Sequence, residues 1–546
     1  MDWTKLLSSE RIRRSTPTDR RNAFESDYGR IIYSPALRRM HDKTQVFPLT
    51  TDDNIHSRLT HSNEVMSLGY TFGIKLSESE KFQRITGKTE SELFRIIPIL
   101  LQNICLVHDI GNSPFGHFGE TIICNYFKEL FEREKEYFNT LNPHQKSDFV
   151  HYDGNAQGLR VLTKLQTLND PFGLNLTYAT LASSIKYPNF KKINKLKKKE
   201  KETIGEIFND NFIENNKHGI FYSELEYFNL IVNETGLKLE DRELRHPLCY
   251  LMEAADTIAY LCMDMEDGFN KGIYSLDHIA KKFGQHKEIE VCREVYDILT
   301  DKFQDETYKI VNARIKLIAY FVKISFDNFI NNLDRIENGT YNEELIEDDK
   351  DNVYEIVKSF STEIFKSREI NNLESTGYSV IVGLLEFYID FIFLKKDDSF
   401  ANRTTALISK SIIDAAIEEN LIKTCQRKIE NIIKDLQSKQ KIFQEKGNTD
   451  NKLNKNINKT LAIQKYFSKL SPIYMEQFEK QKKQKLTTEE YKRLSKVRFK
   501  IVKNINPCFN DLDLYYKLRV VVDFISGMTD QYALKHYQKI SGQRIN

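Results

Sequence analysis

The sequence predicts an all-α protein, and two observations carry that prediction. Apolar residues recur at helical spacing through long stretches, whereas the period-two alternation typical of strands is almost absent. Proline is sparse, at 11 residues, and no proline- or serine-rich linker divides the 546-residue chain. We therefore expect one large helical domain, with a core in residues 1–300 and a C-terminal helical region in residues 301–546 that packs on it. A short hairpin around Gly219 to Tyr222 is an expected exception.

The first element that bears on chemistry is the segment HSRLTHSNEV, which contains Arg58 and His61. In a helix these two side chains lie about one turn apart, so a cation and an imidazole would be neighbours. An isolated histidine is more often a surface or core residue than a ligand. His61 therefore gains meaning only from the elements that follow.

The next element is the apolar stretch Ser91 to Val107, which predicts one buried helix that ends at the adjacent pair His108 and Asp109. A His-Asp pair alone is common by chance, and His41-Asp42 is a second example in this chain. A polar pair at the end of a buried helix is different, because it needs partners. The setting therefore singles out His108 and Asp109.

Glycine and proline in the following text, GNSPFGHFGE, predict a turn before the helix restarts. His117 and Glu120 then stand three residues apart, on one face of the new helix. A histidine oriented by a carboxylate is a usual general acid or base. A capping pair at the start of a helix is the alternative interpretation.

The third element, Leu248 to Phe269, spaces Asp256, Tyr260 and Asp264 four residues apart. On a helix of 3.6 residues per turn these side chains fall within about 80° of each other. Two imidazoles and two carboxylates are then available, from His61, His108, Asp109 and Asp256. Such a set suits a divalent ion, leaves coordination positions open for water and substrate, and activates water.

Seven motifs, in order along the chain, make the sequence resemble the HD-domain deoxynucleoside triphosphate triphosphohydrolases, the bacterial dGTPase-like family. They are SPALRRMHDKTQVFPL, RLTHSNEV, HDIGNSPFGHFGE, HYDGNAQGLR, IKYP, EAADTIAY and DFISGMTDQYAL. The resemblance is dense over residues 20–275 and thinner over residues 505–540, and residues 300–500 carry no usable motif. It implies an HD-domain helical fold with a long C-terminal helical extension, and homo-oligomers, often hexamers built from dimers.

The resemblance also implies roles, residue by residue. The metal ligands would be His61, His108, Asp109 and Asp256, and the catalytic dyad would be His117 and Glu120. The substrate contacts would be Gln45 and Asp264 at the sugar 3′-hydroxyl, Tyr260 against the deoxyribose, and Arg58, Asn155, Lys186 and Tyr187 around the triphosphate. One departure is Thr257, where better studied relatives, including the vertebrate one, can have lysine. That phosphate contact is therefore lost or supplied by another residue.

The activity so implied is hydrolysis of a deoxynucleoside triphosphate, with dGTP as the expected substrate, to the deoxynucleoside and inorganic triphosphate. One divalent ion per site is expected, manganese or magnesium first, with iron, cobalt or nickel as other candidates. Another HD-type phosphohydrolase, a nucleoside monophosphatase or phosphodiesterase, would keep the ligands but not KTQVF or GNAQG. A non-catalytic nucleic-acid-binding regulatory protein would have lost ligands, and none is missing here.

Composition favours a cytoplasmic protein with no membrane segment. The N-terminus is charged and lacks the apolar stretch of a secretory signal. The most apolar window, Tyr378 to Leu394, contains Glu386 and Asp390 and is short for a membrane span, so we expect a buried helix. Seven scattered cysteines without a CxxC motif are expected to be reduced core residues.

The net charge of +2 hides strong local differences. Residues 331–360 carry nine acids against three bases, whereas residues 421–500 carry 21 Lys or Arg against eight Asp or Glu. The second stretch predicts long basic amphipathic helices, interrupted by an Asn-rich loop from Gly447 to Lys459. The run Lys191 to Lys201 adds a second basic patch. These charges indicate either solvated surfaces or contacts with a polyanion, single-stranded DNA or a nucleotide effector.

Overall fold

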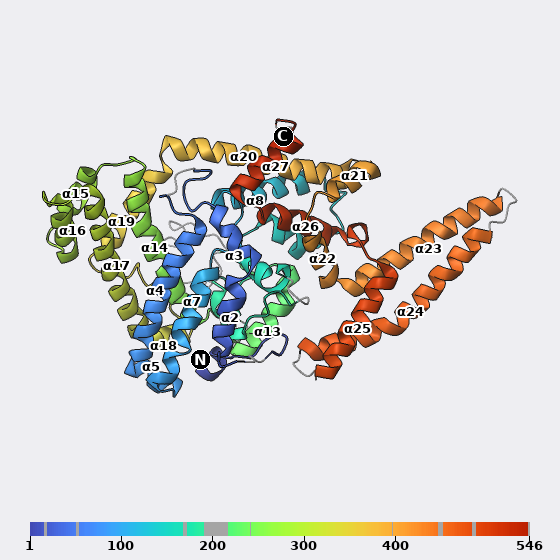
Figure 1. The fold of residues 1–546 in the computed structure, drawn as a ribbon, viewed down its shortest axis with the longest axis horizontal. Coiled ribbons are helices and arrows are strands. Elements are labelled where there is room, and N and C mark those ends of the chain that lie inside the picture. Colours follow the sequence, from blue (N-terminus) through green and yellow to red (C-terminus); the bar gives the residue numbers. More distant parts are fainter. Residues whose placement is uncertain are drawn as a thin grey trace.

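Helices account for nearly all regular structure in the computed structural model (Figure 1), as the sequence predicts. The structure describes residues 1–15, 19–50, 54–166, 172–190, 217–240, 242–395, 397–445, 451–482 and 488–543. The basic run Lys191 to Lys201 lies outside these ranges, so that prediction is not tested.

The N-terminal part of the chain forms short helices around a few long ones. These helices are α1 (Trp3–Leu6), α2 (Ala23–Ile32), α3 (Pro35–Arg39), α4 (Arg58–Glu78), α5 (Glu80–Thr86), α6 (Glu90–Phe94), α7 (Ile97–Val107), α8 (Gly116–Arg133), α9 (Pro143–Val150), α10 (Gly154–Arg160), α11 (Tyr178–Ser184), α13 (Leu225–Thr235), α14 (Pro247–Asn270), α15 (Leu276–Gly284) and α16 (Glu290–Thr300). A π-helical turn, η2 (Val161–Leu165), continues α10, and the 3-10 turns are η1 (Met40–Asp42) and η4 (Tyr222–Glu224).

The C-terminal part is also mainly helical over its described length. It contains α17 (Glu306–Asn331), α18 (Leu333–Glu337), α19 (Val353–Phe365), α20 (Arg368–Ile389), α21 (Asp398–Thr405), α22 (Lys410–Glu419), α23 (Leu421–Glu445), α24 (Asn451–Lys482), α25 (Thr488–Ile505), α26 (Leu514–Ser526) and α27 (Asp530–Ile540). A π-helical turn, η5 (Asp390–Leu394), continues α20, and a 3-10 turn, η6 (Phe509–Asp511), precedes α26.

Two hydrophobic clusters hold these helices together. In the first, α4 packs against α7 and α14, and α14 packs against α17 and α19. In the second, α20 packs against α8, α26 and α27. The first cluster continues past residue 300 to Ile370, and the second joins residues of α8 to the C-terminal helices. The turn between α7 and α8 therefore lies where the two clusters meet. The proposed division at residue 300 stays a prediction.

Three local predictions are wrong in position. The expected single helix over residues 91–107 is broken into α6 and α7, because Pro98 sits in the first turn of α7 and disfavours helical continuity from the residues before it. No hairpin forms at Gly219 to Tyr222. The hairpin of the described residues lies further along the chain, where β1 (Lys238–Leu239) pairs with β2 (Arg242–Glu243). The Asn-rich segment is helical from Asn451 onward, and residues 446–450 lie outside the described ranges.

The helices α23, α24 and α25 form an arm that extends away from the body of the molecule (Figure 1). Its base is tied to the body, since Arg498 pairs with Glu418 at 2.5 Å and Phe478 stacks on Phe172 at 5.9 Å. The basic residues 421–500 form most of this arm. The prediction of long helices there is confirmed for the described residues.

The most apolar window lies in the continuous helix from Arg368 to Leu394. By length and composition alone this is the one helix of the described residues that could cross a membrane, and 44% of its most apolar window is buried inside the protein. Its buried face includes Val380, Leu384 and Tyr388, which belong to the second cluster. The cysteines are all free and five of them are buried, but Cys124 is only partly buried and Cys508 is exposed, so the prediction of core residues is wrong for Cys508 and only partly right for Cys124.

Candidate active site

The four predicted metal ligands come from three helices and meet at one place. His61 lies in the first turn of α4, His108 and Asp109 follow the end of α7, and Asp256 lies in α14. His61 Nε2 is 2.9 Å from Asp256 Oδ1, and His108 Nε2 is 3.3 Å from the same oxygen. Ligand atoms of His61, His108 and Asp109 all lie within 4.8 Å of one another. The spacing is that of a cluster able to share one cation.

The orientation of the His108 ring is fixed by a hydrogen bond to the backbone of Cys105. Its Nδ1 is 2.7 Å from the carbonyl oxygen of Cys105, which can only accept, so Nδ1 carries the proton. Nε2 is buried and has no hydrogen-bond partner among the described residues. A histidine that donates through one nitrogen and leaves the other toward carboxylates is typical of a metal ligand.

Electrostatics at this cluster favour ionised carboxylates and a protonated His108. Burial lowers the pKa of His108, but Asp109 and Asp256 outweigh it and raise that pKa to about 9. Burial raises the pKa of Asp256, yet His108 and His61 hold it well below its usual value. A divalent cation would take the place of those protons, because ligation requires neutral imidazole and ionised carboxylate.

Asp109 is held from both sides. Arg58 Nη1 donates to its Oδ2, and Asn112 Nδ2 donates to its Oδ1 at 2.6 Å. The pKa of Asp109 is lowered: burial would raise it, but the Arg58 guanidinium prevails. Arg58, which we expected beside the triphosphate, is buried, and its guanidinium already pairs with the predicted metal ligand Asp109. Asn112 was missed by the sequence analysis, although it stands inside the quoted motif.

The turn after Asp109 sets the register of His117 and Glu120. Phe115 has φ 61° and Gly116 has φ 58°, and a Cβ at Gly116 would come within 2.7 Å of Arg58 Nη2. Glycine is required there both for its backbone conformation and for space. The helix α8 starts at this point, which confirms the predicted turn and the i, i+3 placement.

His117 and Glu120 form a pair, as predicted. His117 Nδ1 is 2.9 Å from Glu120 Oε2, and Glu120 Oε1 accepts from Gly154 N at 3.1 Å. The Glu120 hydrogen bond raises the pKa of His117. Glu120 is buried while the His117 side chain is 72% exposed, so the carboxylate anchors a ring that faces open space. Both line a cavity of about 250 Å³ that also contains Lys217.

The helix α14 carries Tyr260 and Asp264 beyond Asp256. Tyr260 is half-buried, and burial followed by Glu344 and Asp256 raises the pKa of its phenol. Asp264 is buried, its Oδ1 has no hydrogen-bond partner among the described residues, and burial raises its pKa to about 7. Asp264 is therefore not an ordinary solvated helix acid.

The remaining predicted substrate residues lie in different local settings. Lys186 Nζ pairs with Glu253 Oε1 at 2.9 Å, and Tyr187 lies with its ring 5.7 Å from that ammonium. Asn155 donates to Asp153 Oδ1 at 2.8 Å, at the start of α10. Gln45 Oε1 is buried without a hydrogen-bond partner among the described residues.

Glu253 is a residue that the sequence analysis did not single out. It stands one turn before Asp256 and accepts from Arg245 at 2.7 Å as well as pairing with Lys186. Its position within EAADTIAY was the available signal. Thr257, the departure from better studied relatives, lies 3.4 Å from Glu344 through its hydroxyl. That side chain contacts a carboxylate, so no cation replaces the lysine at this position.

The C-terminal motif reaches back to the turn between α7 and α8. Asp530 Oδ2 accepts from Thr44 N at 3.0 Å, and its Oδ1 accepts from Phe115 N at 3.0 Å. Lys43 Nζ donates to the carbonyl oxygens of Asn112 and Ser526. Hydrogen bonds to Asp530 and Ser526 thus connect the segment next to Gln45 with the turn that follows Asp109.

Comparison with known proteins identifies relatives of this chain. Residues 474–539 match the phosphohydrolase-associated domain family. A deoxyguanosinetriphosphate triphosphohydrolase-like protein of Listeria monocytogenes is 36% identical over 428 residues, 74% of this chain and 87% of the relative. Proteins of the same name from Synechocystis and Pseudomonas aeruginosa are 31% identical over 410 residues (72% and 88%) and 40% identical over 273 residues (49% and 57%).

The helical fold and the match to the phosphohydrolase-associated domain place the chain among the HD-type phosphohydrolases. Within that class, the identity and coverage of the Listeria and Synechocystis relatives show that the chain belongs to the deoxyguanosinetriphosphate triphosphohydrolase-like family.

Proposed function

We propose that the protein hydrolyses a deoxynucleoside triphosphate, with dGTP as the expected substrate, to the deoxynucleoside and inorganic triphosphate. The observation that carries the proposal is the convergence of His61, His108 and Asp109 with Asp256, next to the His117–Glu120 pair. The relatives are named as triphosphohydrolase-like, which agrees with it.

We propose that one divalent ion binds at His61, His108, Asp109 and Asp256, with manganese or magnesium expected and iron, cobalt or nickel as alternatives. When bound, such an ion polarises a phosphoryl oxygen and lowers the pKa of a coordinated water. The support for the site is its donor set, together with His108 Nε2, which is buried, faces the carboxylates of Asp256 and Asp109, and makes no well-aligned hydrogen bond among the described residues.

In this proposal His117 moves a proton at its Nε2, either from the attacking water or to the 5′-oxygen. Glu120 holds the ring through Nδ1 and favours its protonated form. Arg58 keeps Asp109 ionised and can share its charge with a phosphate. Lys186 and Lys217 add positive charge on the same side, although each has a carboxylate partner, Glu253 and Asp153 respectively.

In this proposal the sugar is recognised by two side-chain oxygens that receive no hydrogen bond from the described residues. Gln45 Oε1 and Asp264 Oδ1 are both buried without a hydrogen-bond partner among the described residues. Unpaired buried acceptors are costly, so a hydroxyl donor from the ligand would stabilise both. Tyr260, between Asp256 and Asp264 on α14, would pack against the deoxyribose and leave no room for a 2′-hydroxyl.

We further propose a homo-oligomer, hexameric or dimer-based, located in the cytoplasm, with single-stranded DNA or a nucleotide effector as regulatory ligand. The support for a polyanion is the excess of basic residues over residues 421–500, on the arm formed by α23, α24 and α25. A different HD-type phosphohydrolase, or a non-catalytic nucleic-acid-binding protein, is the competing function.

The test is turnover of the four dNTPs, alone and in mixtures, with manganese or magnesium, and with identification of the products. Inorganic triphosphate and a deoxynucleoside are expected; pyrophosphate or monophosphate would assign the alternative phosphohydrolase, and no turnover a non-catalytic role. His61→Ala, Asp109→Ala and Asp256→Ala should each lose metal and turnover while remaining folded. The conserved fold would be checked by circular dichroism, and one variant with wild-type metal content and rate would exclude the ligand set.

A further inference from the structure

A cavity of about 450 Å³ lies behind the turn that carries Asp109. Its walls come from α3, from α10 with the π turn that follows it, from α22, and from the end of α26 with the segment that leads into α27. Ile110 and Gly111 line it, so it begins directly after the predicted metal ligands. None of its lining residues lines the cavity around His117, so the two are separate spaces. Its volume falls in the range of small-molecule sites.

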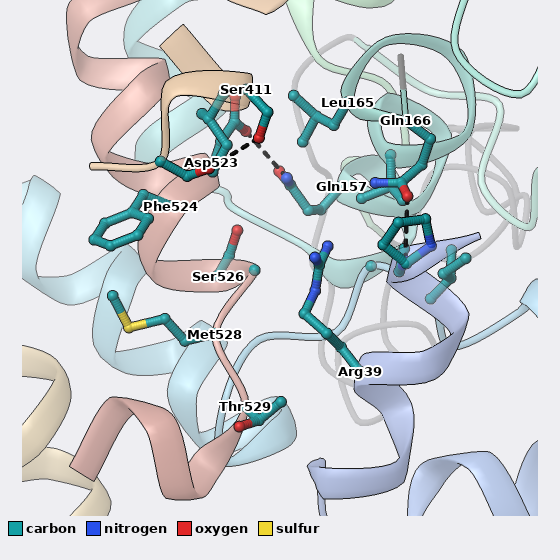
Figure 2. A pocket seen from close by; sticks show the side chains of 18 of the residues that line it. Arg39, Gln157, Leu165, Gln166, Ser411, Asp523, Phe524, Ser526, Met528 and Thr529 are labelled. Carbon is teal, nitrogen blue, oxygen red and sulfur yellow. Dashed lines mark hydrogen bonds between the residues drawn. The ribbon is translucent and has the colours of Figure 1, made fainter. Parts of the chain in front are cut away.

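One wall of the cavity carries a cation that no carboxylate neutralises. Figure 2 shows the Arg39 guanidinium pointing from α3 into the space between Gln157 and Ser526. Its side chain makes no hydrogen bond or ion pair with any residue that the structure describes. The nearby carboxylate, Asp523, is already engaged by Arg160 at 2.9 Å and by Arg519 at 3.0 Å. It therefore leaves Arg39 without a counter-ion.

Polar donors lie close to that guanidinium. Ser526 is buried, and by hydrogen-bond geometry its Oγ has no partner among the described residues. Gln166 Oε1 accepts from Ala36 N at 3.2 Å, which leaves the Gln166 amide nitrogen as a donor toward the cavity (Figure 2). A guanidinium with a hydroxyl and an amide beside it is a usual arrangement for holding an anionic group.

Much of the remaining lining is apolar. Leu165 lies on one side of the cavity, and Phe524 and Met528 lie on the other (Figure 2). Val161, Ile412 and Tyr532 also line it. A ligand that fills the cavity would therefore bury an apolar or aromatic body there. Lys43 also lines the cavity, but its Nζ is held by the carbonyl oxygens of Asn112 and Ser526. Among the described residues Arg39 is therefore the lining cation whose side chain forms no hydrogen bond, and it matches one negative charge. A triphosphate would bring several charges to this cavity, and Asp523 also lines it, so the chemistry disfavours a nucleotide triphosphate.

We propose that this cavity binds a small organic monoanion, an aromatic or apolar body bearing one carboxylate or sulfonate, with Arg39 pairing its charge. The site is distinct from the proposed catalytic site and does not depend on metal or on a dNTP.

The test uses the full chain and 1-anilinonaphthalene-8-sulfonate, an aromatic monoanion whose fluorescence rises in apolar surroundings. Its uncharged counterpart, N-phenyl-1-naphthylamine, has the same body without the sulfonate. Saturable binding of the sulfonate is expected, with affinity lowered at least roughly tenfold by Arg39→Gln because a charge-assisted contact is removed. Arg38→Gln is the matched control, because Arg38 is the neighbouring exposed residue on α3 and does not line the cavity. An aryl carboxylate and an alkyl carboxylate, added as competitors, distinguish the two kinds of body.

A second variant tests the cavity rather than the charge. Ile412→Trp on α22 should fill the apolar side and reduce binding of both probes, with the fold checked by thermal unfolding. Excess dGTP with manganese should not displace the sulfonate, since the catalytic cavity is elsewhere. Equal affinity in Arg39→Gln and Arg38→Gln, equal affinity for the charged and uncharged probes, unchanged binding in Ile412→Trp, or displacement by dGTP would each overturn the proposal.

Discussion

Replacing Glu120 by glutamine tests the proposed dyad while changing few atoms. Glutamine keeps an oxygen that can accept from Gly154 N, now 3.1 Å from Glu120 Oε1. It loses the negative charge beside His117 Nδ1, now 2.9 Å from Oε2. The substitution therefore separates the anchoring of α8 to α10 from the control of the imidazole.

The expected loss follows from the geometry of this contact. A hydrogen bond to a charged partner contributes about 1.5–3 kcal/mol. Because the His117 side chain is 72% exposed, water screens the pair and the lower end of that range applies. About 1.5 kcal/mol corresponds to a roughly tenfold loss of kcat/KM. His117→Ala removes the proton carrier itself and should cost roughly 10² to 10⁴ in rate, with metal content unchanged.

The assay is kcat/KM for dGTP across pH, with metal content measured on the same samples. Glu120 raises the pKa of His117, so removing its charge lowers that pKa. The limb of the profile that belongs to His117 therefore moves to lower pH, whether the residue acts as acid or as base. Glu129→Gln, the same change at an exposed position on α8, should leave rate and profile as in the wild type.

A lower rate with an unmoved limb would refute the reasoning, because Glu120 would then act only through Gly154. An unchanged rate and profile would remove Glu120 from the dyad altogether. Loss of metal in His117→Ala would instead make His117 a ligand.

The remaining predictions concern the sugar, the stability and the arm. Tyr260→Ala should raise turnover of GTP relative to dGTP, because the ring would no longer exclude the 2′-hydroxyl; comparable turnover of both by the wild type would contradict this. Burial raises the pKa of Asp264 to about 7 from the unfolded value of 3.8, so the folded state binds the extra proton between these values and stability falls as pH rises through that window. Asp264→Asn should therefore be more stable than the wild type above pH 7, by up to a few kcal/mol, with the difference fading toward pH 4 in urea unfolding. Single-stranded DNA should bind the arm at low salt and dissociate steeply as salt rises, and fluorescence anisotropy without binding at low salt would leave its charges as a solvated surface.

Periodicity predicted the helical class, and the resemblance of the motifs to a known family implied that His61, His108 and Asp109 share one site. The structure brings their ligand atoms within 4.8 Å of one another. Helix periodicity placed Asp256, Tyr260 and Asp264 on one helix correctly. Helix periodicity could not predict the role of Asp530, because that role depends on a contact with Phe115, 415 residues away in sequence. Glu253 was missed for the same reason, since its partner Lys186 lies in another element.

The predicted helix boundaries were wrong where individual residues outweighed the periodicity of the apolar positions. The apolar text from Ser91 to Val107 has no glycine, but Pro98 begins a new helix and splits it. Asparagines are poor helix formers, yet Asn451 begins a long helix that packs against α23 and α25. Tertiary packing outweighs the small per-residue cost there.

The two hydrogen bonds of Asp530 constrain the order in which this protein can fold during its synthesis. Phe115 and Asp530 are 415 residues apart, so at about 5–20 residues per second the ribosome needs roughly 20–80 seconds between them. Throughout that interval the backbone donors of Thr44 and Phe115 lack the acceptor that joins them. The turn after Asp109 is thus synthesised early in translation and joined to the C-terminal part only near its end, and a message cut short before codon 530 would yield a chain that keeps the first six motifs but lacks Asp530 and the rest of the seventh.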